Sequence, residues 1–466
     1  MPDPKPAAVP LAPDPACGGI VLDMFAGPGG WSTGLRALGL HDIGIEWDPA
    51  ACRTRVAESH LTIEADVAEV DLTPFRGLVW ALLSSPPCQS WSVAGRGGGR
   101  PTAFLAALAG KYDRAWREQM HASNAARRAA LDTWNATWVA AADTNGWWDP
   151  AALDGEPARL TEDGADARTE LYGPAPEDPE DDRGALMAEA VRYVDELRPN
   201  VLAFEQVPPV LVMWQAMVPW LRDRGYSVWT GIVNAADYGV PQTRRRAVLL
   251  ARRDGRPAGP PAATHTRLVD APDDLFGTVL EPWVPMAAAL GWQAGPDGTR
   301  DWDEHVNDQT GTVLDLDWPL TRPATVVAGR GLVQHPGATA NRFNSSTKSR
   351  NDGIRVTVAQ AAVLQSYPED YRFGTDTASQ ASQYLQVGNS VPPVLAAHLF
   401  SVLADRPVTL ETLALLTARP AAPDVDARVA ALPPEVRALL TPTTPTAAEP
   451  TAVEQAPTVT ATVLAA

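Results

Sequence analysis

A strand, a turn and the start of a helix follow one another in Ile20-Val21-Leu22-Asp23-Met24-Phe25-Ala26-Gly27-Pro28-Gly29-Gly30. The apolar residues at its beginning predict a strand, and the pattern over 31–38 predicts the helix that follows. Glycines between a strand and a helix let the backbone approach a cofactor at the helix N-terminus. Because purely structural turns carry glycines as well, this stretch alone is weak evidence for a nucleotide site.

The same alternation of short apolar runs and helical stretches continues along the chain. Further strands are expected at 43–45, 78–83 and 201–204, and further helices at 186–197 and 210–222. This order predicts an α/β fold built from βαβ units with a parallel sheet. A hairpin with strands at 227–233 and 247–251 is expected to follow.

Length and composition limit the classes of protein. The chain has 466 residues, of which 45% are hydrophobic and 16 are tryptophan, so it can hold two or three domains with a sizeable core. It contains no run of about 18 apolar residues, so no membrane span is expected. The 3 cysteines form no CxxC pair and no disulfide framework, which favours a reducing cytoplasm, and no metal site is expected.

Charge is distributed unevenly along the chain. The net charge of −18 argues at first against a nucleic-acid partner. Much of the acid lies between Asp143 and Asp182, however, whereas 244–246 and 252–253 are runs of arginine that form a compact basic cluster. The position of these charges therefore matters more than their sum.

Polar and aromatic side chains are expected at the carboxyl ends of several strands. Glu46 ends one strand, where a carboxylate would accept hydrogen bonds from ribose hydroxyls, and Trp47 beside it could stack on an adenine. Asp66 closes the next strand, and Glu205 ends the strand 201–204. Carboxyl ends of parallel strands meet at one edge of a sheet, so a ligand site is expected there. Each carboxylate taken alone could equally be a solvated or helix-capping side chain.

A cysteine follows the predicted strand 78–83, on a loop that reads Pro86-Pro87-Cys88-Gln89. Two prolines fix the backbone and remove two donors, so the thiol is held on a pre-shaped turn. A thiolate adds readily to an electron-poor carbon when its surroundings lower its pKa. For this cysteine alone, a buried structural role is an equal alternative.

Six segments, in this order, resemble the DNA (cytosine-5) methyltransferase family. They are the glycine-rich opening 23–30, the cysteine loop 85–90, Phe204-Glu205-Gln206-Val207, Gln242-Thr243-Arg244-Arg245-Arg246, Arg322-Pro323-Ala324-Thr325-Val326 and Gln386-Val387-Gly388-Asn389-Ser390-Val391-Pro392-Pro393. Residues 355–373 also have the look of this family. The resemblance covers about 18–100, 184–256 and 321–404. It implies a Rossmann-like S-adenosylmethionine-dependent methyltransferase fold, with a mostly parallel sheet, helices on both faces, and a smaller irregular target-recognition domain.

The resemblance also implies a site for S-adenosyl-L-methionine. The residues implied to bind this cofactor are Phe25, Gly27, Pro28, Gly29, Glu46, Trp47, Asp66, Val67, Pro86, Asn389 and Ser390. Among them, Glu46 would hold the ribose, Trp47 would lie against the adenine face, and Asp66 would bind the adenine amine. Asn389 and Ser390 would return from the closing segment to complete the site.

Four residues are implied to act on the substrate. Cys88 would attack carbon 6 of a cytosine swung out of a DNA helix, because that atom is unreachable in the stack. Glu205 would hydrogen-bond the ring at nitrogen 3, and Arg244 and Arg246 would contact the ring and hold Glu205. Carbon 5 would then take the methyl group and lose its proton, which releases the cysteine.

The resemblance divides the chain into segments with different roles. They are a disordered Pro/Ala-rich leader at 1–17, a catalytic domain at 18–256 with an insertion at 101–183, a target-recognition domain at 257–352, a return to the catalytic domain at 353–404 and a disordered Ala/Pro/Thr-rich tail at 405–466. One departure lies next to a catalytic residue: Gln206 stands where the family usually has asparagine. Its longer amide could shift the loop of Cys88.

Three other functions are alternatives. RNA cytosine methylation could use the same scaffold, although the sizeable variable region between 253 and 322 favours target reading on DNA. A catalytically silent DNA-binding homologue would not need Cys88, Glu205 and Arg244. A nicotinamide-dependent dehydrogenase would explain only the glycine turn and Glu46.

The expected partner is double-stranded DNA, the expected state is a monomer, and a cognate restriction endonuclease is a further candidate partner. The target sequence cannot be read from the chain, because base readout depends on the geometry of a few side chains.

Overall fold

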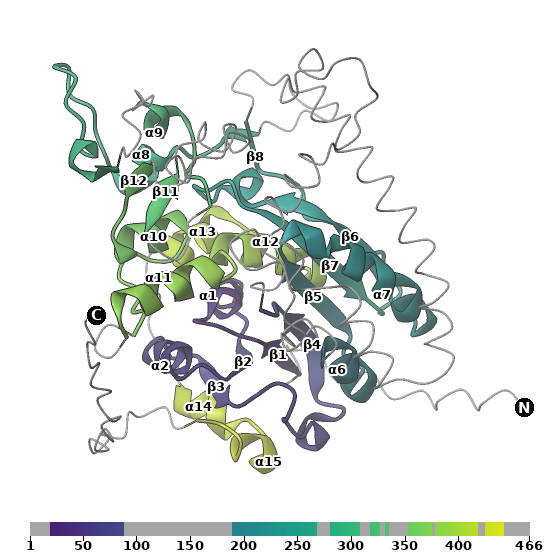
Figure 1. Ribbon diagram of the computed structural model, residues 1–466. Coiled ribbons are helices and arrows are strands. Elements are labelled where there is room, and N and C mark those ends of the chain that lie inside the picture. Colours follow the sequence, from purple (N-terminus) through teal and green to yellow (C-terminus); the bar gives the residue numbers. More distant parts are fainter. Residues whose placement is uncertain are drawn as a thin grey trace, which may run out of the picture.

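The computed structural model describes residues 19–87, 189–267, 280–307, 317–326, 331–334, 353–374, 378–417 and 425–441. The predicted leader 1–17, Cys88 and the insertion 101–183 lie outside the described residues, as does part of 257–352. Figure 1 shows a central sheet with helices on both sides and a smaller group of helices and short strands beside it.

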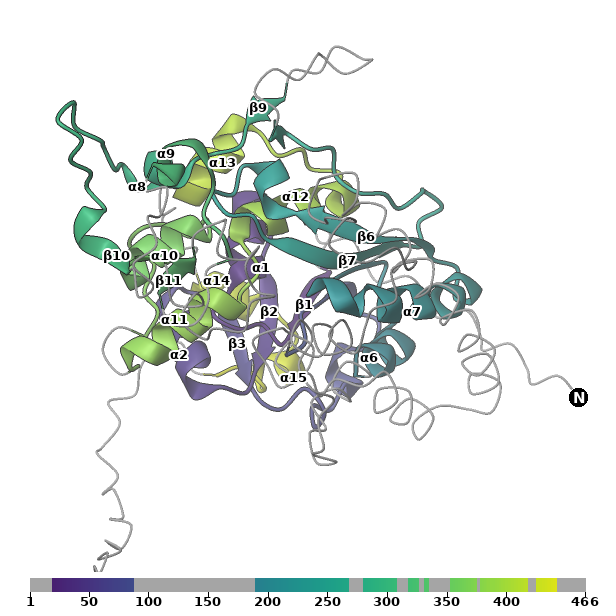
Figure 2. The ribbon, with the colours of Figure 1, turned by 45° about the horizontal axis from the view of Figure 1, so that its top comes forward.

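The central sheet has seven strands in the order β3-β2-β1-β4-β5-β7-β6. Their bounds are Ile20–Met24 (β1), Asp42–Glu46 (β2), Leu61–Glu64 (β3), Val79–Ser84 (β4), Val201–Gln206 (β5), Ser227–Asn234 (β6) and Arg245–Arg252 (β7). Strands β1 to β5 pair in parallel, whereas β7 runs antiparallel to both β5 and β6. The predicted hairpin is therefore present as β6 and β7, which lie side by side in Figure 2.

Helices cover both faces of this sheet. The helices and 3-10 turns of this part are α1 (Gly30–Ala37), α2 (Pro49–Ala57), η2 (Thr73–Phe75), α6 (Glu189–Leu197), η5 (Pro208–Val210), α7 (Leu211–Asp223), η6 (Ala235–Tyr238) and α12 (Pro393–Ala404). One apolar cluster packs α6 and α7 against strand residues such as Leu22 and Leu82. A second cluster packs α1 and α12 against the neighbouring residues Val21 and Leu83, which point to the other face.

The strand sequences explain this two-faced burial. All residues of β1, β4 and β5 are buried. Nearly continuous apolar runs are typical of strands in a parallel sheet that is covered on both sides. The prediction of a Rossmann-like α/β fold with a mostly parallel sheet is confirmed.

A smaller unit lies at one side of the sheet in both views (Figures 1 and 2). Its elements are α8 (Met286–Leu290), η7 (Asp303–His305), β10 (Val306–Asn307), α9 (Trp318–Thr321), β11 (Leu332–Gln334), β12 (Gly353–Arg355), α10 (Val358–Leu364) and α11 (Gln380–Asn389). Two short strands outside this unit, β8 (His265–Thr266) and β9 (Glu281–Pro282), pair with each other, and β8 contacts η6. A separate apolar cluster holds the smaller unit together, with Trp302 and Trp318 buried at its centre. The predicted smaller irregular domain is thus present, and its core includes residues beyond 353.

Two consecutive helices, α11 and α12, form one long helical stretch, of which α12 is strongly apolar. By length and hydropathy alone the stretch Gln380–Ala404 could cross a membrane, but 78% of an 18-residue apolar part of it is buried inside the protein. Its apolar residues are therefore used in packing, in keeping with the position of α12 against α1.

The segment 405–441 differs from the disordered tail expected from its composition. It contains three helices, α13 (Leu410–Thr417), α14 (Val425–Ala430) and α15 (Pro434–Arg437). Leu416 is buried in the cluster of α1 and α12, and Val436 is buried in the cluster of α6 and α7. Over its described parts, 405–417 and 425–441, the expectation of disorder is wrong, because a few spaced apolar residues suffice to dock short helices onto existing clusters.

Candidate active site

The sheet register brings the candidate residues to one edge. Met24 pairs with Ile45 on one side and with Ser84 on the other, and Ser84 pairs in turn with Phe204. The residues that follow these strands therefore leave the sheet together. Strand β7 runs in the opposite direction, so its first residues, Arg245 and Arg246, lie at this same edge.

The turn after β1 has three residues in the left-handed region. The φ angles are 57° for Phe25, 52° for Gly27 and 105° for Gly29, which precedes α1. A Cβ atom on Gly29 would lie 2.7 Å from Cδ2 of His60, so both the conformation and the space favour glycine here. The Pro28 carbonyl accepts a hydrogen bond from Tyr371 at 2.6 Å, which fixes the turn from outside.

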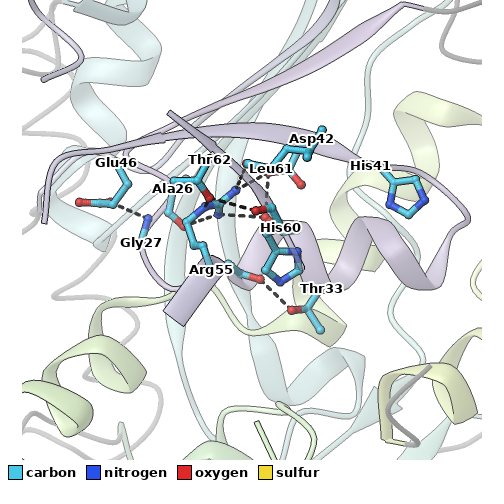
Figure 3. Close-up of polar contacts among 12 residues, drawn as sticks. Ala26, Gly27, Thr33, His41, Asp42, Glu46, Arg55, His60, Leu61 and Thr62 are labelled. Atoms are coloured by element: carbon cyan, nitrogen blue, oxygen red, sulfur yellow. Dashed lines mark hydrogen bonds and ion pairs between the residues drawn. The ribbon is translucent and has the colours of Figure 1, made fainter. Parts of the chain in front are cut away.

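Glu46 holds this turn from the end of β2. Its Oε2 atom accepts the Gly27 N–H at 2.7 Å (Figure 3). Its Oε1 atom accepts the N–H groups of Trp47 at 2.9 Å and Asp48 at 2.8 Å. Burial raises the pKa of this carboxyl, while the three N–H donors oppose that rise. The carboxylate is therefore fixed in place beside the glycine turn.

The two other strand-end positions differ from Glu46 in exposure. The Trp47 indole is 71% exposed, which leaves an aromatic face open at the edge of the sheet. Asp66 is half-buried and caps its own turn by accepting the Ala68 N–H at 2.8 Å. Val67 is buried, and its carbonyl accepts the Tyr193 hydroxyl at 2.9 Å.

The closing segment comes back to the same turn. A Cβ atom on Gly30 would overlap the Val391 carbonyl oxygen, so the two backbones are in direct contact. Ser390 is buried next to this contact, and Asn389, at the end of α11, is exposed. Segments that are far apart in the sequence therefore complete one site.

These observations fit an adenosine-containing cofactor. The positive-φ turn presents backbone at a helix N-terminus, where space is open because a Cβ atom on Gly27 would meet no atom within 4 Å. A fixed carboxylate suits ribose hydroxyls, and the open face of Trp47 suits a purine ring. The donor and acceptor set is thus compatible with S-adenosylmethionine.

A buried ion pair occupies the other half of the edge. Nε of Arg246 lies 2.8 Å from Oε1 of Glu205, and both side chains are almost entirely buried. Glu205 comes from the end of β5 and Arg246 from the start of β7, so the antiparallel pairing of these strands brings them together. The expected contact between the two side chains is present.

Arg244 contacts the closing segment. Its Nη2 atom donates to the carbonyls of Gly388 at 2.8 Å and Ser390 at 3.1 Å. The Ser390 carbonyl also accepts Nε2 of Gln365 at 2.6 Å. The contacts described for Arg244 thus join the arginine segment to the closing segment, whereas Glu205 is held by Arg246. Two residues apart on an extended chain, Arg244 and Arg246 have different surroundings.

Gln206 reaches the loop that leads to the candidate nucleophile. Its Nε2 atom donates to the Pro86 carbonyl at 2.5 Å, and its Oε1 atom accepts the Val207 N–H. Pro86 is buried, and Ser85 is fixed by a hydrogen bond of 2.9 Å from the Trp31 indole. Cys88 itself lies outside the described residues. The loop residues before it, Ser85 and Pro86, are held by hydrogen bonds from Trp31 and Gln206.

One polar network under the site was not expected from the sequence. Arg55, fully buried on α2, lies 3.2 Å from Asp42 and donates to the carbonyl of Ala26 at 3.4 Å (Figure 3). It also donates to the hydroxyl of Ser32 at 3.0 Å. Its guanidinium therefore ties α1 and β2 to the glycine turn. The sequence has no signal for this role, because an arginine within a helix is usually solvated.

Comparisons with known proteins identify the family of this chain. The family model for C-5 cytosine-specific DNA methylases matches residues 20–105, 175–284 and 300–404. The type II methyltransferase M.XorII of Xanthomonas oryzae is 29% identical over 262 residues, which are 47% of this chain and 61% of the relative, so the chain spans less than two thirds of that protein. M1.HphI of Haemophilus parahaemolyticus is 23% identical over 80% of this chain and 84% of the relative. The crystal structure of the S. pombe Dnmt2 methyltransferase matches at 14% identity and a TM-score of 0.45, over 83% of this chain and 98% of that one. Because the family model matches more than half of the residues, the chain belongs to the family of C-5 cytosine-specific DNA methylases.

Proposed function

We propose that this protein transfers a methyl group from S-adenosyl-L-methionine to carbon 5 of cytosine in a specific DNA sequence. The observation that carries the proposal is the arrangement of one sheet edge. The fixed carboxylate of Glu46 and the open indole of Trp47 end β2, and the Glu205–Arg246 pair lies across the edge beyond β4. The edge therefore has a cofactor half, around Glu46 and Trp47, and a reaction half, around Glu205 and Arg246. The loop that leads to Cys88 lies between these two halves.

The cofactor half would bind through the residues of three strand ends and the closing segment. Phe25, Gly27, Pro28 and Gly29 would contact the cofactor through the turn, with Pro86, Asn389 and Ser390 completing the site. Glu46 would accept the ribose hydroxyls, Trp47 would stack on the adenine, and Asp66 and Val67 would bind its edge. The cofactor supplies an electrophilic methyl group.

The reaction half would act on a flipped-out cytosine. The Cys88 thiolate would form a bond to carbon 6, and the electron pair displaced toward the ring would make carbon 5 nucleophilic. Glu205 would hydrogen-bond nitrogen 3 and Arg246 would hold Glu205 in position. After methylation, loss of the carbon-5 proton would restore the ring and break the bond to sulfur. Arg244 would act more indirectly, through the closing segment that it contacts.

The remaining assignments are proposals about partners. Residues 257–352 would read the target in double-stranded DNA, since their aromatic core holds an irregular unit beside the catalytic edge. The protein would act as a monomer in the cytoplasm, as the methylating partner of a restriction endonuclease.

Bisulfite sequencing of plasmid DNA tests the function directly. DNA from cells that express the protein should contain cytosines that resist conversion within one short sequence, whereas DNA from cells with the empty vector should not. Complete conversion of the plasmid, together with protected cytosines in cellular RNA, would instead support RNA methylation.

The Glu46→Ala variant should bind the cofactor more weakly by about 1–3 kcal/mol, because charge-assisted hydrogen bonds to the ribose are lost. Titration calorimetry with S-adenosylmethionine measures this loss. Glu64→Ala is the matched control, since Glu64 pairs with Glu46 in the neighbouring strand but has an exposed side chain. Equal affinities of wild type and the Glu46 variant would contradict the ribose role.

A further inference from the structure

The C-terminal segment 425–441 lies beyond the last residue that the family model matches, which is 404. It nevertheless docks on the catalytic domain, where α14 lies next to β3 (Figure 1) and α15 contacts η2. Val436 of α15 is completely buried and belongs to the same apolar cluster as Leu61 and Ile63 of β3. The segment therefore lies outside the residues that the family model matches and packs into the apolar cluster to which β3 contributes.

Strand β3 needs a contact of this kind. It has four residues, occupies the outer position of the sheet and, among the strands that the structure describes, pairs with β2 alone. The outer side of an edge strand carries unpaired N–H and C=O groups, so a short edge strand is held weakly. Its end nevertheless leads directly into Asp66 and Val67, which are proposed to bind the adenine.

Thr441 pairs with the outer side of β3. Its N–H donates to the Thr62 carbonyl at 2.8 Å, and its Oγ1 atom accepts the Glu64 N–H at 3.0 Å. These two bonds satisfy the Thr62 carbonyl and the Glu64 N–H, which face away from β2 near the end of the strand. On the inner side, the Ala65 N–H donates to the Glu46 carbonyl at 3.0 Å, so the end of β3 is held from both sides.

A second contact fixes the segment at the other end of the strand. Arg428 of α14 donates to the Ser59 carbonyl at 3.3 Å and lies 3.1 Å from Nδ1 of His41. Ser59 precedes β3, so the segment follows the strand from its beginning to its end. Contacts at both ends define one docked position for the segment.

We propose that Thr441 is a positioning residue for the cofactor site. By closing the outer side of β3, it holds the strand end that carries Asp66 and Val67 in the position required to bind the adenine. The inference rests on the proposed function, because it concerns the affinity for S-adenosylmethionine. It adds that a segment outside the family's common region is part of the binding apparatus.

Thr441→Val in the full chain removes the acceptor of the Glu64 N–H and keeps the shape of the side chain. Amide hydrogen exchange at Glu64 should become about fivefold faster, as expected for the loss of one hydrogen bond. The dissociation constant for S-adenosylmethionine should rise by about two- to fivefold, with kcat at saturating cofactor unchanged. Thr441→Pro, which removes the N–H donor instead, should have an effect in the same direction.

The control is Thr409→Val, because the hydroxyl of Thr409 bonds with Thr412 at the start of α13, away from β3. This variant should keep the wild-type exchange rate at Glu64 and the wild-type affinity. If exchange at Glu64 does not change in Thr441→Val, the contact is absent in solution and the proposal is overturned. Faster exchange with unchanged cofactor affinity would leave Thr441 a purely structural role and would also overturn it. If wild-type protein binds no cofactor, the proposed function fails first, while the exchange data still report separately on the contact.

Discussion

Cys88→Ser protein should bind S-adenosylmethionine like the wild type but should transfer no measurable methyl group to DNA. A serine hydroxyl is far less acidic than a thiol and is a poor nucleophile without a dedicated base, so the rate should fall by about a thousandfold or more. Incorporation of labelled methyl into DNA measures the rate, and calorimetry measures cofactor binding. A residual rate within about tenfold of wild type would mean that Cys88 is not the nucleophile.

Cys52→Ala is the matched control for this experiment. Burial raises the pKa of the Cys52 thiol to about 12, so this cysteine carries no thiolate at neutral pH. Its Sγ atom donates to the Glu46 carbonyl at 3.3 Å within the core. Methyl transfer should survive in this variant. DNA that contains 5-fluorocytosine adds a second readout: carbon 5 then has no proton to lose, so wild type and Cys52→Ala should form a stable covalent complex and Cys88→Ser should not.

Glu205→Ala should lower kcat by about a hundredfold to ten-thousandfold, the range for a lost proton-transfer or ring-stabilising group. It should also destabilise the fold, because Arg246 is left as a buried charge without the carboxylate that lies 2.8 Å away. Single-turnover methyl transfer at saturating DNA and cofactor measures the first effect, and urea unfolding measures the second.

A double-mutant cycle separates the roles of this pair. If Arg246 acts by holding Glu205, the double variant Glu205→Ala, Arg246→Ala should lose little more activity than Glu205→Ala alone. Arg245→Ala is the control, because it removes the same charge from an exposed neighbouring residue. Independent, additive losses would show that Arg246 does not work through Glu205. A wild-type rate for Glu205→Ala would exclude the carboxyl from the chemistry.

The sheet could be predicted because its signals are local. Strands such as Val201–Gln206 are short apolar runs between helical patterns. Such runs can be recognised in the sequence without any knowledge of long-range contacts. The edge position of Glu46 and Glu205 follows from the same pattern, since carboxyl ends of parallel strands share one edge.

Contacts between distant segments could not be predicted in this way. The bond from Gln206 to the Pro86 carbonyl joins residues 120 positions apart, and the bonds of Arg244 to the closing segment span 144 and 146 positions. Such pairings depend on side-chain geometry after folding. The docking of 425–441 could not be predicted for another reason: the tail 405–466 taken as a whole is Ala/Pro/Thr-rich, a composition typical of disorder, and the apolar residues that dock, such as Val436, form only a short part of it.

The close packing of α1 on α12 has a consequence for the order in which the protein becomes competent during synthesis. A Cβ atom on Gly34 would lie 2.6 Å from the Pro393 carbonyl oxygen, and Gly30 touches Val391, so the helix after the glycine turn rests on backbone made more than 350 residues later. A ribosome adds about 5–20 residues per second, so the turn waits for tens of seconds without its partner. Contacts of such long range also slow folding, because the intervening chain must be closed into a loop first. A nascent or truncated chain that lacks α12 would therefore carry the glycine turn without the helix that supports it, and the capacity to modify DNA should arise only after α12 has been synthesised.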